Sequence, residues 1–285
     1  MRYITFENAA GARQPGVLRN GDVIGLSKAG FDDLLDVIRG GAEARRRVDE
    51  FAALPPGDAV YALSAVRICA PLPHPPKFIC VGLNYRDHAE EVGAKIPDVP
   101  TIFNKFPTTI IAPGDNIILP SISSQPDYEA EFAFVIGTGG RKIAACNWKD
   151  HVFGYTMVND VSARDFQRAT TQWLMGKTFD TFGPMGPAIV TADEIEDPHA
   201  LDITMTINGE VMQKSNTRNL IFDIPKLLEF LSSVFTLQPG DVVSTGTPGG
   251  VGSARKPPRY LRHGDECVVE VQGLGQLRNP VVAES

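Results

Sequence analysis

The sequence contains no apolar run that approaches the roughly 20 residues of a membrane-spanning helix. It also lacks a surplus of basic residues, because 27 Lys and Arg stand against 34 Asp and Glu, a formal net charge of −7. Proteins that bind nucleic acids without sequence preference need a basic surface. We therefore expect neither a membrane nor a nucleic acid among the partners of this chain.

Cysteine is scarce and widely spaced. The four cysteines are Cys69, Cys80, Cys146 and Cys267, and no two of them form a Cys-x-x-Cys pair. This spacing disfavours a zinc site or a redox motif. The chain also does not open on the basic segment and apolar segment of a secretory signal peptide. We expect reduced thiols and a cytoplasmic protein.

The chain does contain enough apolar residues, 43% of 285, to build a substantial core. Residues 1–68 have the pattern of a small α/β domain, with three short β-rich runs followed by helical stretches at 31–41 and 42–54. Four prolines between Pro71 and Pro76 then favour a linker. The remainder, 69–285, is predicted to be a second and larger domain.

Short β-rich runs separated by Gly, Pro, Asn and Asp dominate this larger region. Asn208-Gly209 between two alternating runs predicts a β-hairpin. Helices are few: we expect one at 86–93, one beginning near Ser162, and one at 223–235 with Asp223 as its N-cap. Because strands and helices do not alternate regularly, the fold class is predicted to be α+β and dominated by β structure.

The run "DYEAEFAFVIG" (127–137) brings two carboxylates together at the mouth of an apolar strand. Side chains alternate along a strand, so Glu129 and Glu131 face the same way. Carboxylates this close repel each other unless a cation joins them, and a hard divalent metal would accept both. Asp160, at the end of another apolar run, is placed to supply a third oxygen ligand. The alternative is that both glutamates are solvated residues of an edge strand.

A second cluster is "NYRDHAEEVG" (84–93), which follows an apolar strand. On a helix, His88 and Glu91 are three residues apart and share a face. A carboxylate can fix the tautomer of a neighbouring histidine and raise its basicity, which yields a general base for water. The alternative is an ordinary solvated helix face.

The third cluster surrounds Lys177 in "WLMGKTFDTFGPMGP" (173–187). Its neighbours are mostly apolar residues and glycines, so little is available to solvate its charge. A partly buried lysine needs an anionic partner, which a metal-bound carboxylate or an anionic substrate would supply. The alternative is that the lysine extends to the surface.

Together these clusters resemble the fumarylacetoacetate hydrolase family. The resemblance rests on six segments that follow the family's order and cover about residues 76–282, and the N-terminal region is similar to a small domain of many bacterial members. The segments are "VGLNYRDHAEE", "DYEAEFAFVIG", "GYTMVNDVSARDFQ", "GKTFDTFGPMGP", "NGEVMQKSNT" and "TGTPGGVG".

The resemblance implies a catalytic domain of mixed β-roll or sandwich type, a homodimer and a Mg²⁺ or Mn²⁺ cofactor. It implies a small-molecule 2-oxo acid as substrate. The metal-ligand positions are Glu129, Glu131 and Asp160, the catalytic positions are His88, Glu91, Lys177 and Gln167, and the substrate-binding positions are Arg164, Thr181, Thr247 and Lys105.

The expected reaction is hydrolysis of a carbon–carbon bond in a 2,4-dioxo acid, either an acylpyruvate or a diketo acid derived from a sugar acid. His88 with Glu91 would activate water, and the metal and Lys177 would stabilise the enolate that leaves. The same site would also suit the oxaloacetate decarboxylases and diene-dioate isomerases of the family. A third possibility is a non-enzymatic protein whose acidic cluster holds a stabilising ion.

Overall fold

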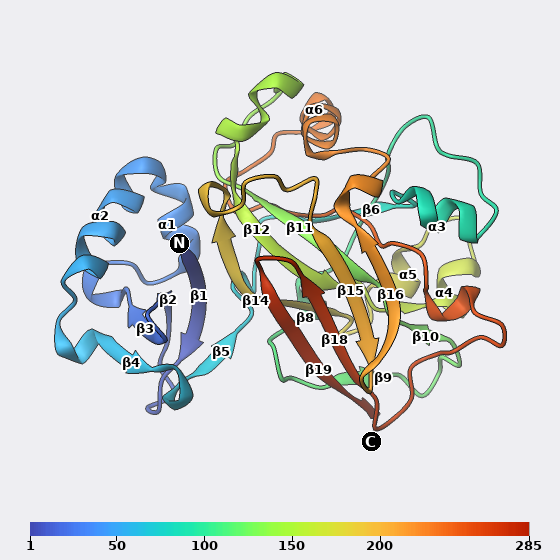
Figure 1. Ribbon diagram of the computed structural model, residues 1–285, viewed down its shortest axis with the longest axis horizontal. Helices are drawn as coiled ribbons and strands as arrows, with labels where there is room; N and C mark the ends of the chain where they lie inside the picture. Colours follow the sequence, from blue (N-terminus) through green and yellow to red (C-terminus); the bar gives the residue numbers. More distant parts are fainter. Residues whose placement is uncertain (285) are drawn as a thin grey trace.

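The computed structural model of the chain describes residues 1–284. Its smaller part, in blue at the left of Figure 1, contains the expected β-rich runs and both expected helices. The elements of this part are β1 (Arg2–Glu7), β2 (Arg13–Arg19), β3 (Asp22–Gly25), α1 (Leu34–Arg39), α2 (Gly41–Ala53), β4 (Val60–Ala62) and β5 (Arg67–Cys69).

Helix α1 begins where the sequence supplies a cap. The Asp33 side chain accepts a hydrogen bond from the first turn, and the Asp36 side chain accepts one from the Asp33 backbone, which completes a capping box. Leu34 and Val37 on α1 are buried together with Val48 on α2. The two helices thus cover one face of the N-terminal strands (Figure 1).

The main sheet runs through both parts of the chain. Strand β1 pairs antiparallel with β14, so that Arg2 lies opposite Val190. The domain boundary expected at residue 68 stays a prediction, because the pairing of β1 with β14 joins the two parts of the chain in one sheet. From β14 the sheet continues through β12, β11, β17 and β6 to β7. These strands are β6 (Phe78–Gly82), β7 (Thr101–Asn104), β11 (Ala130–Ile136), β12 (Val152–Asn159), β14 (Gly183–Thr191) and β17 (Val242–Ser244), and β8 (Ile110–Ile111) pairs with β14.

A second sheet packs against the main sheet. Side chains from both sheets form one core, in which Phe132 and Phe134 of β11 meet Met205 and Val269 of the second sheet. The predicted hairpin at Asn208-Gly209 joins its first two strands. In spatial order its strands are β16 (Glu210–Asn216), β15 (Asp202–Ile207), β18 (Glu266–Val271), β19 (Gly275–Ala283) and β9 (Ile117–Leu119).

Helices in the larger part are short, apart from α6, which Asp223 caps as predicted. The helix expected near Ser162 begins two residues later. Ser162 and Ala163 instead form β13 (Ser162–Ala163), which pairs with β10 (Pro126–Asp127). The helices are α3 (Arg86–Glu91), α4 (Arg164–Arg168), α5 (Leu174–Lys177) and α6 (Ile224–Val234).

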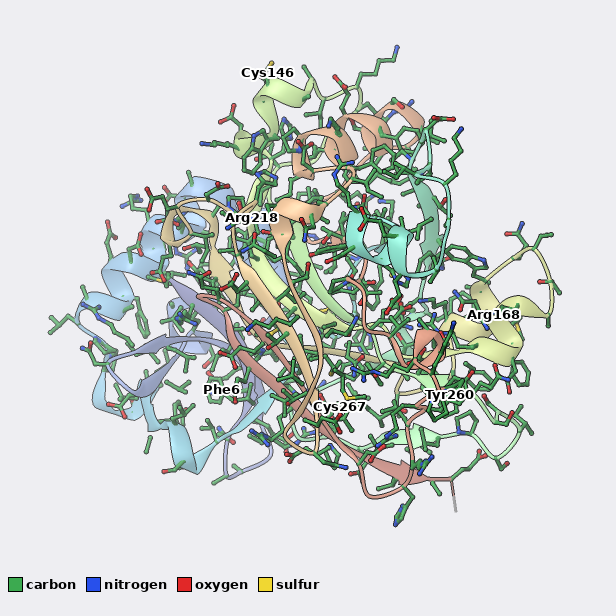
Figure 2. All side chains as sticks on the ribbon, turned by 45° about the vertical axis from the view of Figure 1, so that its right-hand side comes forward. Phe6, Cys146, Arg168, Arg218, Tyr260 and Cys267 are labelled. Carbon is green, nitrogen blue, oxygen red and sulfur yellow. The ribbon has the colours of Figure 1, made fainter. Side chains whose placement is uncertain are left out.

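The predicted α+β class with dominant β structure is confirmed by this architecture. Within residues 1–284 no helix is both long and apolar enough to cross a membrane. The four cysteines are free, and Figure 2 shows two of them, Cys146 and Cys267, far apart.

Candidate active site

Three carboxylates meet where β11 begins and β12 ends. These two strands are antiparallel, and Ala130 at the start of β11 lies opposite Asn159 at the end of β12. Glu129 and Glu131 flank Ala130, and Asp160 follows Asn159, so strand pairing brings the three acids together. One oxygen from each lies within 4.8 Å of the others, and all three residues are buried.

The alternative of a solvated edge strand for the two glutamates is wrong. Strand β11 lies between β12 and β17, in the interior of the main sheet. Ala133 and Val135 on one face and Phe132 and Phe134 on the other are all buried. The strand therefore holds the carboxylates of Glu129 and Glu131 away from bulk solvent, where each needs a partner.

Two lysines supply cationic partners to these acids. The Nζ atom of Lys177 donates to Glu129 Oε2 at 2.6 Å and to Asp160 Oδ2 at 2.7 Å. The Nζ atom of Lys105 donates to Asp160 Oδ1 at 2.5 Å. Burial lowers the pKa of Lys177, but the charges of Asp160 and Glu129 outweigh it, so that the pKa lies above its usual value. The alternative of a lysine that extends to the surface is wrong.

Glu131 has a different environment. Its Oε2 atom accepts hydrogen bonds from Ser244 Oγ at 2.5 Å and from the Gly246 backbone N–H at 3.0 Å. Gly246 has a φ of +96°, a conformation that glycine adopts without strain. Within residues 1–284 no lysine or arginine forms an ion pair with Glu131. Burial, together with the charges of Asp160 and Glu129, raises the pKa of Glu131 well above its usual value.

Arg164 connects the acids to a further carboxylate. Its Nε atom donates to Asp127 Oδ2 at 2.8 Å, and its Nη2 atom lies 2.7 Å from Glu129 Oε1. Its Nη1 atom donates to Gln167 Oε1 at 3.0 Å. Burial raises the pKa of Glu129, but Arg164 and Lys177 outweigh this effect and lower it to about 2. Glu129 is therefore ionised at neutral pH.

These charges fit a divalent cation. A further cation among the acids would lower the raised pKa of Glu131 and so favour its ionised form. All three candidate ligands are carboxylate oxygens, the donors that Mg²⁺ and Mn²⁺ prefer. Four buried carboxylates face three buried cationic side chains: Asp127, Glu129, Glu131 and Asp160 against Lys105, Arg164 and Lys177.

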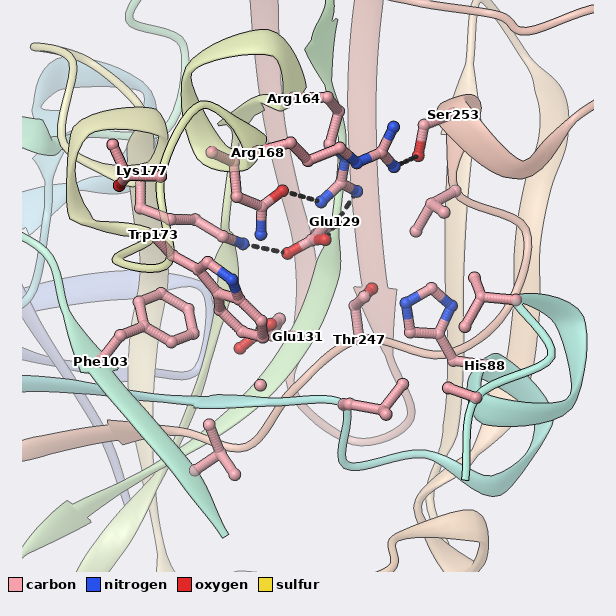
Figure 3. A pocket seen from close by; sticks show the side chains of 18 residues that line it. His88, Phe103, Glu129, Glu131, Arg164, Arg168, Trp173, Lys177, Thr247 and Ser253 are labelled. Carbon is pink, nitrogen blue, oxygen red and sulfur yellow. Dashed lines mark hydrogen bonds and ion pairs between the residues drawn. The ribbon is translucent and has the colours of Figure 1, made fainter. Parts of the chain in front are cut away.

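Close packing of α5 on α4 positions the lysine and the glutamine. A Cβ atom at Gly176 would lie only 2.3 Å from the Gln167 backbone nitrogen, so a glycine is required there. This contact lets Lys177 approach Glu129 from α5 while Gln167 and Arg164 approach from α4. Figure 3 shows the side chains of Lys177 and Arg164 meeting at Glu129 from the two helices.

Helix α3 lies on the opposite side of the site and carries His88 and Glu91, whose side chains share a face as the helical spacing predicted. Nδ1 of His88 lies 3.2 Å from Glu91 Oε2, and Glu91 Oε1 accepts a hydrogen bond from the Gly250 N–H at 2.8 Å. Asp87 anchors the helix further, because its carboxylate accepts hydrogen bonds from Ser215 and Asn219. The pair is thus tied to a loop and to β16, so the alternative of a freely solvated helix face is wrong.

A cavity of about 440 Å³ separates the two sides. Six predicted residues besides His88 line it, namely Glu129, Glu131, Arg164, Gln167, Lys177 and Thr247. We call Glu129, Glu131, Asp160, Lys105 and Lys177 the floor of the site, and His88, Glu91, Arg168 and Ser253 its rim. Asp160 and Glu91 lie behind the lining and contact it through Lys177 and His88.

Two predicted substrate-binding residues, Thr181 and Lys105, lie outside the lining of this cavity, so their contact with substrate stays a prediction. The Thr181 hydroxyl accepts a hydrogen bond from the Ile118 N–H at 2.9 Å and faces another hollow, beside β9. The Lys105 ammonium is fully buried and bonded to Asp160, so in this chain it supports a carboxylate. Thr247 does line the cavity, but its hydroxyl donates to the Ala130 carbonyl at 2.9 Å.

Sequence reasoning missed several residues that shape the site. Asp127 is fully buried and accepts hydrogen bonds from Arg164, from Gly252 and from Ser253, so it ties α4 to the loop after β17. Its place in the acidic run was a usable signal. Trp173 and Arg168 also line the cavity, but no pattern in the sequence marked either one.

Comparison with known proteins agrees with this geometry. Residues 77–282 match the family described as fumarylacetoacetate (FAA) hydrolase C-terminal. The chain belongs to the fumarylacetoacetate hydrolase family. The matched region of this family contains every residue that we place in the floor and the rim.

Relatives of this chain are named for several different activities. The chain is 50% identical over 221 residues to a mitochondrial oxaloacetate tautomerase of Bos taurus, covering 77% of this chain and 70% of the relative. A fumarylacetoacetate hydrolase structure from psychrophilic Exiguobacterium antarcticum is 38% identical, with a TM-score of 0.88 over 100% of both chains. A maleylpyruvate hydrolase from Sphingobium sp. SYK-6, in complex with manganese(II) and pyruvate, is 31% identical with a TM-score of 0.83, also over 100% of both chains.

Proposed function

We propose that the chain is an enzyme that interconverts the keto and enol forms of a 2-oxo acid of the oxaloacetate type. One observation carries the proposal: a buried acidic floor that fits a divalent metal and a His–Glu pair line opposite sides of one cavity. The half-identical oxaloacetate tautomerase supports this reaction over the hydrolysis that the sequence alone favoured. Tautomerisation and hydrolysis both pass through an enolate, and the protein must stabilise its negative charge.

The floor would bind the 2-oxo acid end of the substrate. A Mg²⁺ or Mn²⁺ ion, when bound by Glu129, Glu131 and Asp160, would supply Lewis-acid stabilisation of negative charge on substrate oxygens. Lys177 uses two of its three N–H donors on Glu129 and Asp160, which leaves one for a substrate oxygen. Gln167 accepts from Arg164 through its carbonyl, so its amide nitrogen remains a donor beside the substrate.

Two residues of the rim, His88 and Glu91, would carry out the proton transfer. With the Nδ1–H of His88 directed at Glu91, Nε2 would be the base. Nε2 takes a proton from C3 of the keto form, and a C2–C3 double bond forms as charge moves to the C2 oxygen. The C2 oxygen then takes a proton from solvent to give the enol, His88 releases its proton to solvent, and the reverse steps restore the keto form. No bond between carbon atoms breaks in this reaction.

Ultraviolet absorbance of the oxaloacetate enol tests the proposal. We expect the protein with Mg²⁺ or Mn²⁺ to accelerate the approach to keto–enol equilibrium beyond the rate with metal alone. A chelator should abolish the acceleration and added metal should restore it. Absence of acceleration by the metal-loaded protein would overturn the proposal.

Hydrolysis of an acylpyruvate is the second candidate. The same His88–Glu91 pair could activate water, and the structural relative that holds manganese and pyruvate is a maleylpyruvate hydrolase. Acetylpyruvate distinguishes the two reactions, because hydrolysis releases pyruvate and tautomerisation releases none. Stoichiometric pyruvate formation, lost in a His88→Gln variant, would favour the hydrolase. Pyruvate formed from oxaloacetate would instead indicate a decarboxylase.

A homodimer is also proposed. Phe106, Ile118 and Ile122 are exposed apolar side chains on neighbouring segments of the larger part, and a second copy would bury them. Light scattering coupled to size-exclusion chromatography should give twice the chain mass of 30.9 kDa. A monomeric mass would refute it. Cellular location stays a prediction.

A further inference from the structure

Arg168 occupies the rim of the cavity but takes no part in the ion network beneath it. It is the last residue of α4, its side chain lines the cavity, and the residue is exposed. Within residues 1–284 it forms one hydrogen bond, from Nη2 to Ser253 Oγ, which is 3.5 Å long. Figure 2 shows Arg168 at the outer surface, and Figure 3 shows its guanidinium reaching Ser253. Most of its five N–H donors are therefore free for a ligand.

The other cationic side chains of the lining are already paired. Arg164 is held by Asp127 and Glu129, and Lys177 by Glu129 and Asp160. Within residues 1–284 Arg168 forms no ion pair. The cavity thus has two groups of cationic side chains. Arg164 and Lys177 are paired with carboxylates, whereas Arg168 at the rim has no carboxylate partner within residues 1–284.

This second zone fits a carboxylate. A planar guanidinium binds a carboxylate through two parallel N–H bonds, a geometry that a lysine cannot reproduce. If the 2-oxo acid end of the substrate lies on the floor, the far end of a short substrate points to the rim. We propose that Arg168 binds the distal carboxylate and so selects dicarboxylic 2-oxo acids. This inference rests on the proposed function, since it assumes that the 2-oxo acid end meets the floor.

Apolar side chains near the rim also affect which substrates bind. Val92, Ala94 and Val251 line the cavity beside His88 and offer apolar contacts. A substrate with an uncharged end would contact these side chains and leave Arg168 in solvent. A substrate with a carboxylate at that end gains the arginine, and with both ends bound its C3 atom lies between floor and rim, on the side of His88. Arg168 is accordingly a specificity-determining residue, and it takes no part in the proton transfer.

A matched pair of substrates and a matched pair of variants test this role. Oxaloacetate and its 4-methyl ester have the same carbon chain, but only the former carries a distal charge. We expect Arg168→Gln to raise the KM for oxaloacetate by about tenfold or more, the usual scale for a hydrogen bond to a charged group. Its kcat should change less than threefold, and the kinetics with the ester should not change. Arg168→Lys should recover part of the loss.

The control is Arg39→Gln, the same substitution at the exposed last residue of α1 in the N-terminal part. It should leave both substrates unaffected. An equal rise in KM for oxaloacetate and its ester in Arg168→Gln, or no rise for either, would overturn the proposed role of Arg168.

Failure of the proposed function can be recognised separately. If the metal-loaded wild type does not tautomerise oxaloacetate, binding of 3,3-dimethyloxaloacetate, which has no proton at C3, is measured by calorimetry in the presence of Mn²⁺. Binding that weakens about tenfold in Arg168→Gln, with no change for the corresponding 4-methyl ester, would support the distal-carboxylate site. Equal binding to the wild type and the variant would refute it.

Discussion

The floor and the rim of the site differ in how the protein holds them. Lys105 and Asp160 in the floor have fully buried side chains, and each floor carboxylate accepts at least two hydrogen bonds or ion-pair contacts of 3.0 Å or less. In the rim, the side chains of His88 and Glu91 are 13% and 26% exposed, and Arg168 is exposed. The rim is carried by a six-residue helix, a loop and the end of a five-residue helix.

This difference separates two kinds of chemistry. Any reaction through a 2-oxo acid enolate needs the floor, because charge must be stabilised in a dry and pre-organised setting. The rim decides what happens to that enolate and which substrate tail is accepted. Members of one family with tautomerase and hydrolase activities are expected to share the floor and to differ above it. Four substitutions test this division, from the strongest expected effect to the weakest.

Glu131→Gln should abolish metal binding by the floor. The amide keeps the size of the side chain but removes the charge that a divalent cation requires, so we expect oxaloacetate tautomerisation to fall by about 10³-fold. Mn²⁺ should raise the melting temperature of the wild type but not of the variant. Glu210→Gln, an exposed position at the start of β16, is the control. Full activity in Glu131→Gln would remove this residue from the site.

Lys105→Met should cost stability. The substitution leaves Asp160 with one cationic partner in a buried setting, and breaking a buried ion pair costs about 3 kcal/mol. Urea denaturation of the metal-free protein measures the free energy of unfolding. The exposed Lys226→Met on α6 should change it by less than about 0.5 kcal/mol. A similarly small change in Lys105→Met would mean that Lys177 alone neutralises Asp160.

His88→Gln should remove the general base of the rim and leave metal binding by the floor unchanged. We expect a loss of about 10²-fold in kcat, the usual contribution of a general base. The Mn²⁺-dependent rise in melting temperature should stay as in the wild type, in contrast to Glu131→Gln. The exposed neighbour Glu90 serves as the control through Glu90→Gln. Loss of metal stabilisation in His88→Gln would show that floor and rim are not independent.

Asp87→Asn should have the smallest effect. An amide keeps one acceptor for Ser215 but loses the charge that strengthens the contacts with Ser215 and Asn219. We expect kcat to fall only about threefold, a cost of under 1 kcal/mol. Faster hydrogen exchange in α3 should accompany it, since the helix opens locally. Unchanged exchange in α3 would show that Gly250 and Glu91 hold the helix by themselves.

Much of the site was predictable because its signals are local. Alternation along one strand brought Glu129 and Glu131 to one face, and helical spacing paired His88 with Glu91. The position of Thr181 depends on non-local contacts: its backbone turns with a φ of +70°, and its hydroxyl accepts a hydrogen bond from Ile118 in another strand. No spacing within residues 173–187 contains that information.

Sequence alone determined which groups could do the chemistry, because period-two and period-3.6 patterns follow from local backbone geometry. It also placed Asp160 at the end of an apolar run, from which a third oxygen ligand was expected. Only the tertiary structure decided how those charges are balanced. The antiparallel register of β11 with β12 brings Asp160 to the glutamates, and the close approach of α5 to α4 brings Lys177 and Arg164 to them. Lys105 reaches Asp160 from the segment after β7. Those long-range contacts leave Glu131 without an ion pair and Arg168 open at the rim, and local sequence patterns do not specify them.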